Sequence, residues 1–198
     1  ERYDHLQKGR NYTARLSRRT VTFDSTGKAT GAGERSEENR LDRWGERYRE
    51  GRVVEYRRLG FSVAFLHLQN FADPAFWKTH CFAVTEWATL GERKVLRLNF
   101  WPTRQVRTPD WAGWAFLDSA TSELRRVEFR LVGVPEGRRP WKLEGFTTFT
   151  APMPSIVVPE SVAAVWWRTK PANPSAHPEV LQLLRLTGLG QTGSRREP

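Results

Sequence analysis

The chain has 198 residues, of which 38% are hydrophobic and 12% aromatic, including nine Trp and eleven Phe. This content of large apolar rings excludes a chain that is disordered throughout, and the length is sufficient for a sizeable core. The net charge of +10 favours an anionic partner, such as nucleic acid or a phosphate-bearing membrane surface. However, only six of the 32 basic residues are Lys, and an excess of Arg is also typical of GC-rich genomes.

The sequence carries little information about compartment. Its single cysteine, Cys81, excludes an internal disulfide, and no run of 18 apolar residues could form a membrane-spanning helix. No signal peptide is recognisable, and the chain begins with Glu1 rather than Met. We therefore expect a part of a longer, exported polypeptide whose signal lies upstream.

The N-terminal segment, residues 1–52, is predicted to contain a strand or hairpin, a loop and a short helix. Tyr12, Ala14 and Leu16 alternate with polar residues, which indicates the strand. The following stretch TGKATGAGERSEEN, residues 26–39, is rich in Gly, Thr and charge and indicates a mobile loop.

A short charged helix is predicted over LDRWGERYRE, residues 41–50. Leu41, Trp44 and Tyr48 recur there at helical spacing and would form one apolar stripe.

From residue 53 the apolar period changes to two, and residues 53–190 are predicted to form an antiparallel β domain. The clearest unit is a hairpin in which the turn-forming run DSATSE follows one alternating segment and precedes another. Val127 and Phe129 alternate with charged residues in the second segment. Residues 191–198 are expected to be a frayed tail.

Three further stretches of this domain are predicted to interrupt or end the strands. NFADPAF, residues 70–76, indicates a turn, and KPANPSAHPE, residues 170–179, indicates an irregular loop. EVLQLLRL, residues 179–186, fits either a last strand or a helical turn, and residues 187–198 are expected to fray.

Seven or eight closely spaced strands with almost no helix between them favour sequential antiparallel pairing over a parallel βαβ sheet. The sequence therefore predicts a mainly β fold with a single antiparallel sheet and one or two short helices.

Motifs that carry catalytic chemistry are not recognisable in the sequence. The four His residues form no HxxE, HxxH or HExxH pattern, and there is no CxxC, GxSxG or phosphate-binding glycine loop. His80 and Cys81 are adjacent and would face opposite sides of a strand, which is unsuitable for a Cys–His nucleophile pair. We expect a small buried Cys beside a hydrogen-bonded His, and we predict no catalytic residue, metal or cofactor.

The candidate ligand-binding residues lie in WPTRQVRTPDWAGW, where aromatic and basic side chains alternate. They are Trp101, Arg104, Arg107, Trp111 and Trp114. Such side chains can stack on bases or sugars or lie at a lipid headgroup boundary. Alternatively, the Trp rings fill a curved sheet while the Arg side chains extend into solvent.

Residues 76–135 resemble the β region that follows the regulatory domain in bacterial carboxypeptidase-regulatory-like-domain-containing proteins. The pattern of that family is FxxTHCF, then LxFxP, then a hairpin containing LDxxT. The matching residues are Phe76, Thr79, His80, Cys81, Phe82, Leu98, Phe100, Pro102, Gly113, Leu117, Asp118, Thr121, Leu124 and Phe129. The resemblance does not imply peptidase activity, and LQNFADPAF departs from the acidic, aromatic segment that the family carries before THCF.

The LDxxT hairpin is also similar, at the level of fold, to hairpins of lipoprotein-carrier proteins. That resemblance implies a strongly curved, half-barrel-like sheet whose concave side holds acyl chains.

Three functions remain open. The first is a non-catalytic, exported cell-envelope module, periplasmic or at the outer membrane. It would bind an apolar or lipid-like ligand, an anionic envelope component or a protein partner. The second, less favoured because Arg is spread along the whole chain, is a nucleic-acid-binding domain that uses Arg and Trp. The third is a structural adaptor without a small ligand.

Overall fold

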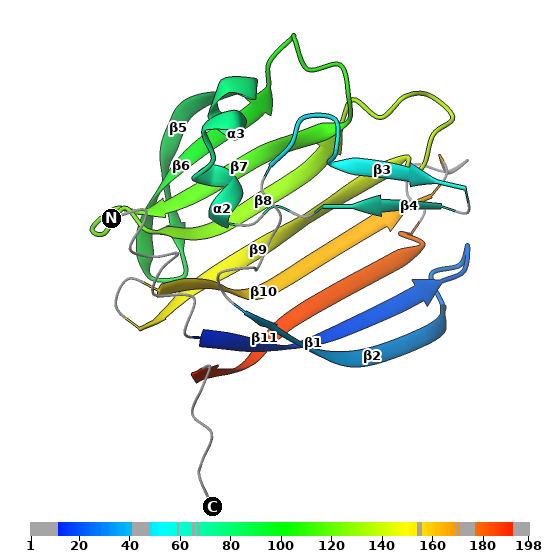
Figure 1. The fold of residues 1–198 in the computed structure, drawn as a ribbon, viewed down its shortest axis with the longest axis horizontal. Coiled ribbons are helices and arrows are strands. Elements are labelled where there is room, and N and C mark those ends of the chain that lie inside the picture. Colours follow the sequence, from blue (N-terminus) through cyan, green and yellow to red (C-terminus); the bar gives the residue numbers. More distant parts are fainter. Residues whose placement is uncertain are drawn as a thin grey trace, which may run out of the picture.

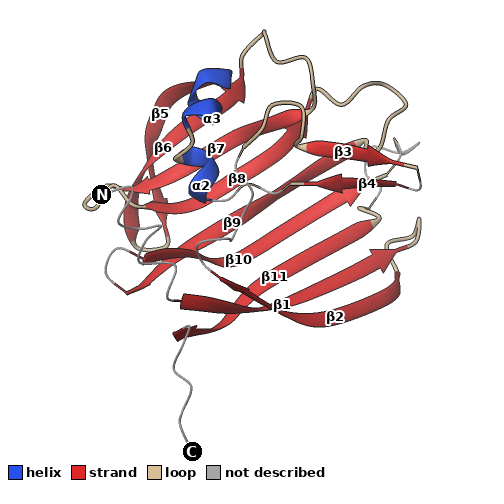
Figure 2. Cartoon of the chain, in the orientation of Figure 1, coloured by secondary structure: helices blue, strands red, loops and turns tan. Residues whose placement is uncertain are grey.

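The computed structural model contains one large open sheet, one two-stranded sheet and two short helices (Figure 1). Strands make up most of the chain (Figure 2). The described residues are 12–40, 48–58, 60–64, 66, 68–153, 156–168, 170 and 177–191. Within them, the predicted mainly β fold with one large antiparallel sheet and one or two short helices is confirmed.

The large sheet has nine strands in the order β2-β1-β11-β10-β9-β8-β7-β6-β5, and every neighbouring pair is antiparallel. The strands are β1 (Tyr12–Phe23), β2 (Ala29–Arg40), β5 (His80–Leu90), β6 (Arg93–Pro102), β7 (Asp110–Asp118), β8 (Leu124–Val132), β9 (Lys142–Met153), β10 (Ile156–Trp167) and β11 (Val180–Gln191). Because β2 and β5 lie at opposite edges, the sheet is open and resembles a half-barrel.

The predicted hairpin is formed by β7 and β8, with Ala115 opposite Val127. Asp118 orders the turn, since its Oδ1 accepts hydrogen bonds from the backbone N–H groups of Ala120 (3.0 Å) and Thr121 (3.2 Å). The turn ends at Ser122, whose φ of 57° is left-handed.

The predicted mobile loop at residues 26–39 is wrong from Ala29 onward, because β2 forms a hairpin with β1. Asp24 closes the turn by accepting hydrogen bonds from Thr26 N (2.9 Å) and Lys28 N (3.1 Å), and Gly27 has a φ of 82°. An edge strand pairs on one side only and tolerates Gly and charge, and its charged side chains also discourage addition of a further strand. This explains why the sequence of β2 lacks the alternation of apolar residues that would have predicted a strand.

Two other local predictions are corrected. NFADPAF contains helical residues rather than a simple turn. Asp73 caps the helix by accepting from Ala75 N at 2.9 Å, while Phe71 and Phe76 pack together. Residues 187–191, expected to fray, belong to β11, so the strand alternative for residues 179–186 is confirmed.

Some predicted features lie outside the described residues. These are residues 41–47 of the expected helix, residues 171–176 of the Pro-rich stretch and residues 192–198 of the tail.

A separate unit packs on one face of the large sheet, and we call the described residues of 48–79 the cover. It contains β3 (Val54–Arg57), β4 (Gly60–Val63), α2 (Leu68–Phe71) and α3 (Pro74–Thr79). In Figure 1 the cover lies in front of the half of the sheet that begins at β5. Neither short helix, nor any other helix in the described part of the chain, is long and apolar enough to cross a bilayer.

The main hydrophobic core lies between the cover and the sheet. At its centre, the Phe129 ring lies in a cross-strand row between Gly113 and Gly145 and packs edge-on against Trp111 at 5.0 Å. A Cβ on Gly145 would lie 3.0 Å from Phe129 Cζ and 2.2 Å from the Ala163 carbonyl oxygen. The absence of a side chain at this glycine therefore allows the ring and the strands to approach each other closely.

Candidate ligand-binding face

The strand register divides the sheet into an inner face, which the cover contacts, and an outer face. One inner row runs from an exposed edge to a buried centre. It contains Val84, Leu98, Ala115, Val127 and Thr147. Val84 is exposed, Leu98 is half-buried, and the last three members are buried. The inner face therefore offers a continuous apolar surface that begins at the sheet edge.

Residues 48–73 of the cover are held to the sheet by side chains. The end of α3 differs, because Thr79 runs directly into β5 and its carbonyl accepts a hydrogen bond from Thr103 N at 2.8 Å. Among the described residues, the backbone hydrogen bonds of residues 52–73 run within the cover itself. Trp111 bridges the two units, since its ring is buried in the inner face and its Nε1 donates to the Ala64 carbonyl at 3.0 Å. Displacement of residues 48–73 would therefore leave the backbone ladder of the large sheet intact.

A second bridge is a buried polar cluster at the start of β5 and β7. The Tyr48 hydroxyl donates to Asp110 Oδ2 at 2.5 Å, and Thr79 Oγ1 lies 3.2 Å from the Tyr48 oxygen. Asp110 Oδ1 accepts from the backbone N–H of Trp111 at 2.8 Å. His80 Nε2 lies 3.6 Å from Asp110 Oδ1 and 3.1 Å from the Trp111 carbonyl. The cluster thus connects the cover to two strands.

Burial shifts the titration of all three ionisable groups in this cluster. It raises the pKa of Asp110 to about 6, although hydrogen bonds from Tyr48 and the Trp111 backbone oppose the shift. Burial also raises the pKa of Tyr48. For His80, burial lowers the pKa, while hydrogen bonding to the Phe76 and Trp111 carbonyls partly compensates.

The buried cluster is better suited to fastening the cover than to chemistry on a substrate. Asp110 and His80 are 0% and 4% exposed, and the Phe76 ring stacks on the His80 ring at 3.9 Å. A general acid or base must lie within hydrogen-bond reach of the substrate, and these groups are enclosed by protein atoms. Within the described residues, no group of three or more His, Cys, Asp or Glu is arranged to hold a metal ion.

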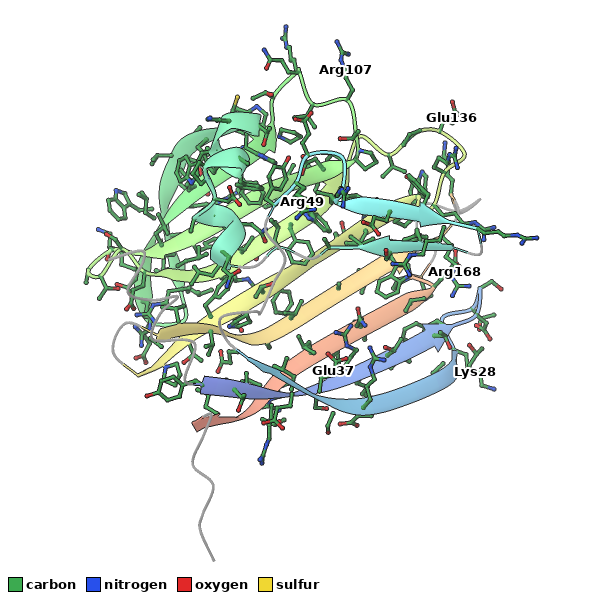
Figure 3. All side chains as sticks on the ribbon, in the orientation of Figure 1. Lys28, Glu37, Arg49, Arg107, Glu136 and Arg168 are labelled. Carbon is green, nitrogen blue, oxygen red and sulfur yellow. The ribbon has the colours of Figure 1, made fainter. Side chains whose placement is uncertain are left out.

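The predicted ligand-binding residues do not form one site. Trp111 lies in the core beneath the cover, whereas Trp114 lies on the outer face. Trp101 is also on the outer face and is 39% exposed. Arg104 and Arg107 are exposed on the loop between β6 and β7, where Arg107 points away from the sheet (Figure 3). Trp111 fits the alternative prediction, in which the Trp rings pack into the core of a curved sheet.

Trp114 is half-buried between basic side chains rather than open to a ligand. The guanidinium carbons of Arg97 and Arg130 lie 4.9 and 6.0 Å from its ring centroid. Arg97 also pairs with Glu86, so its charge is already balanced by a neighbour on the same face.

The prediction for His80 and Cys81 was half correct. His80 is buried and both ring nitrogens lie 3.1 Å from carbonyl oxygens, but Cys81 is exposed. Cys81 projects to the outer face of the edge strand, opposite Trp101, where no described element covers it. The adjacent residues do face opposite sides, as the strand period requires.

The sequence analysis missed an exposed apolar group on α3 and β5. Trp77, Val84 and Trp87 are 49%, 63% and 59% exposed. A β-bulge between Val84 and Glu86 places Val84 opposite Leu98 and Trp87 opposite Leu96, so both face the inner side. Residues three apart in a regular strand face opposite sides, and therefore simple alternation could not identify this group.

No protein-family model matches the chain, and no curated protein is similar to it in sequence. The resemblance of residues 76–135 to the carboxypeptidase-regulatory-like proteins therefore stays an expectation.

One solved structure is similar in fold, and it bears the name of an outer membrane lipoprotein-sorting protein domain from Vibrio parahaemolyticus. The sequence identity is 10% and the TM-score 0.47, over 100% of this chain and 96% of the other. We draw no functional conclusion from similarity at this level.

Proposed function

We propose that this chain is a non-catalytic cell-envelope module that holds an acyl chain between the cover and the inner face of the sheet. The observation that carries the proposal is that residues 48–73 of the cover are attached to an apolar sheet face by side chains rather than by strand pairing. The envelope location is taken from the sequence-based expectation that this chain is part of a longer, exported polypeptide.

Energetics favours this occupant because the cover contributes mainly apolar contacts that a hydrocarbon chain could replace. Val54, Leu66 and Phe76 of the cover are buried in the main core. Each buried methylene of an acyl chain contributes roughly 0.8 kcal/mol, so a long chain could offset on the order of 10 kcal/mol of lost cover contacts.

The row Trp87, Leu96, Leu117 and Leu124 supports insertion at the β5 edge. Its members are opposite one another on successive strands, and their exposure falls from 59% at Trp87 to 8% at Leu124. An acyl chain that entered there would remain in contact with apolar side chains from the edge to the core.

The nucleic-acid alternative is weakened by the ion pairing of the Arg residues. Arg18 and Arg35 flank Glu37, with Nε–Oε1 distances of 2.7 and 2.9 Å, and Arg125 pairs with Asp118 and Glu123. Phosphate binding would have to compete with these carboxylates, whereas a polyanion-binding surface normally presents unpaired basic side chains.

A fluorescent fatty acid, 11-(dansylamino)undecanoic acid, tests the proposal in solution without membranes. We expect its emission to increase on binding, palmitate to displace it, and native mass spectrometry to show one fatty acid adduct that denaturation removes. Leu98→Ser, on the inner face, should weaken binding at least about tenfold because a polar group enters the apolar path.

Leu181→Ser is the matched control, because Leu181 is also half-buried but lies on the outer face opposite Val21. Equal weakening by both substitutions, or no fluorescence increase with the wild-type chain, would contradict acyl binding at the inner face. The second result would favour a structural adaptor.

A further inference from the structure

The exposed apolar group on β5 and α3 forms a continuous surface, which we call the rim: Trp77, Val84 and Trp87. Trp77 stacks on the Phe82 ring with a centroid distance of 4.2 Å, and its Nε1 donates to the Phe71 carbonyl at 2.6 Å. Phe82, Val84 and Trp87 are successive inner-facing residues of β5. Single exposed apolar side chains are common, but three adjacent ones indicate an interaction surface.

The charges beside the rim are positive. Lys94 Nζ lies 4.8 Å from the Trp87 ring centroid, and Lys78 is exposed in the last turn of α3. The two carboxylates of residues 74–102 lie elsewhere: Glu86 pairs with Arg97 on the outer face, and Glu92 lies in the turn after β5. A third carboxylate, Asp73, caps the N-terminus of α3 by accepting from Ala75 N. The rim therefore combines large aromatic rings with two ammonium groups that form no ion pair with another described residue.

The edge itself is poorly suited to addition of a strand from another protein. The bulge between Val84 and Glu86 interrupts the regular spacing of β5, and bulges in edge strands hinder pairing with a further strand. A membrane surface requires no matching backbone hydrogen bonds, only side chains that can enter the interface.

We propose that the rim docks this chain onto the surface of an anionic lipid bilayer. Trp rings are favoured at the boundary between headgroups and hydrocarbon, where the indole N–H or ring edge stays near water. Lys side chains beside them add attraction to anionic headgroups. This surface contact goes beyond the binding of a single acyl chain, and it shares Val84 and Trp87 with the proposed entry path of that chain.

Co-sedimentation of the whole chain with vesicles tests the docking surface. The vesicles are phosphatidylcholine alone and phosphatidylcholine mixed with phosphatidylglycerol. We expect preferential binding to the anionic vesicles, with a blue shift of Trp emission. The double variant V84S/W87S should reduce partitioning at least about tenfold, and Lys94→Gln should reduce it roughly fivefold on anionic vesicles only.

Trp141→Ser is the matched control, because Trp141 is 40% exposed but lies just before β9, away from the rim. It should leave vesicle binding unchanged. Circular dichroism would establish that both variants are folded, which is expected because the substituted rim residues are more than half exposed.

Absence of wild-type binding to anionic vesicles would overturn the proposal, as would an equal loss in Trp141→Ser. Loss of a dimer in V84S/W87S by sedimentation velocity, without wild-type vesicle binding, would assign the rim to contact between two copies instead. The fatty acid probe separates the two proposals: vesicle binding without probe binding contradicts only the acyl site. Val84 and Trp87 also lie at the start of the proposed acyl path, so Lys94→Gln is the variant that separates the two sites. Probe binding that survives in Lys94→Gln while binding to anionic vesicles falls supports a separate docking surface.

Discussion

Both faces of the large sheet carry aromatic side chains, but the neighbours that pack against these rings differ between the two faces. On the inner face, Trp111 and Phe129 pack ring against ring beneath the cover. On the outer face, Trp114 and Phe146 lie beneath the guanidinium groups of Arg97 and Arg126 at 4.9 and 4.0 Å.

This difference explains why the chain is rich in both Trp and Arg. The outer-face Arg residues shield aromatic surface with their aliphatic stems while their charged ends stay hydrated. Much of the basic charge is therefore part of the sheet surface. On the inner face, the cation above a ring is Lys94 at the exposed edge, 4.8 Å from the Trp87 centroid, whereas Trp111 and Phe129 beneath the cover pack against each other. The covered part of the inner face is therefore the surface that an apolar ligand could share with the cover.

The largest expected effect comes from the two tryptophans of β7. Trp111→Ala should lower the free energy of unfolding by about 3–5 kcal/mol, because it removes a buried ring and the hydrogen bond to Ala64. Trp114→Ala should cost only about 1–2 kcal/mol, since the ring is half-buried against Arg97. Urea denaturation monitored by circular dichroism measures both. Similar losses would contradict the distinction between the faces.

A smaller effect is expected at Gly145, which can be compared with Gly33 in the same cross-strand row of the inner face. Gly145→Ala would place a Cβ 2.2 Å from the Ala163 carbonyl oxygen and should cost about 1–3 kcal/mol. Gly33→Ala is the matched control, because this glycine, on edge strand β2, has no atom within 4 Å of the added Cβ. Its effect should be within about 0.5 kcal/mol. A neutral Gly145→Ala would show that the close packing against Phe129 is not required.

The two aspartates that bound β7 should respond to pH in opposite directions. The folded pKa of Asp110, about 6, is above the ordinary value of 3.8. Its contribution to stability is therefore complete below pH 3.8 and is lost as pH rises through 6. Hydrogen bonds from the backbone of Ala120 and Thr121 lower the pKa of Asp118, so its contribution is instead lost as pH falls.

Asp110→Asn should gain stability relative to wild type between pH 4 and pH 7, by about 1–3 kcal/mol. Asp110→Asn also changes the free energy of unfolding at every pH, because an amide cannot accept both hydrogen bonds that Asp110 accepts. The decisive quantity is therefore how the difference in stability between the two proteins varies with pH. His80 has a lowered pKa, which makes folding less favourable as pH falls, but His80 is present in both proteins. Unfolding curves that differ by a constant amount across this range would contradict the raised pKa.

The sequence predicted the strands of residues 80–132 well, because alternating apolar residues and turn-forming segments coincide there. It could also have separated the candidate binding residues, since Trp111 and Trp114 are an odd number of positions apart and must face opposite sides of a regular strand. The cover position, the bulge in β5 and the Tyr48–Asp110 bond could not be predicted. They depend on packing between residues distant in sequence, such as the 62 positions that separate Tyr48 from Asp110.

The smallest effect is expected at Cys81, whose neighbour His80 faces the core. Cys81→Ser should change the free energy of unfolding by less than about 0.5 kcal/mol, because the thiol is exposed on the outer face. It should also leave binding of the fatty acid probe intact, since the proposed ligand lies on the other face. In the wild-type chain, 5,5′-dithiobis(2-nitrobenzoic acid) should react with the thiol without denaturant. Slow reaction that accelerates only on unfolding would show that another part of the chain covers the outer face at β5, and would remove the contrast between these neighbouring residues.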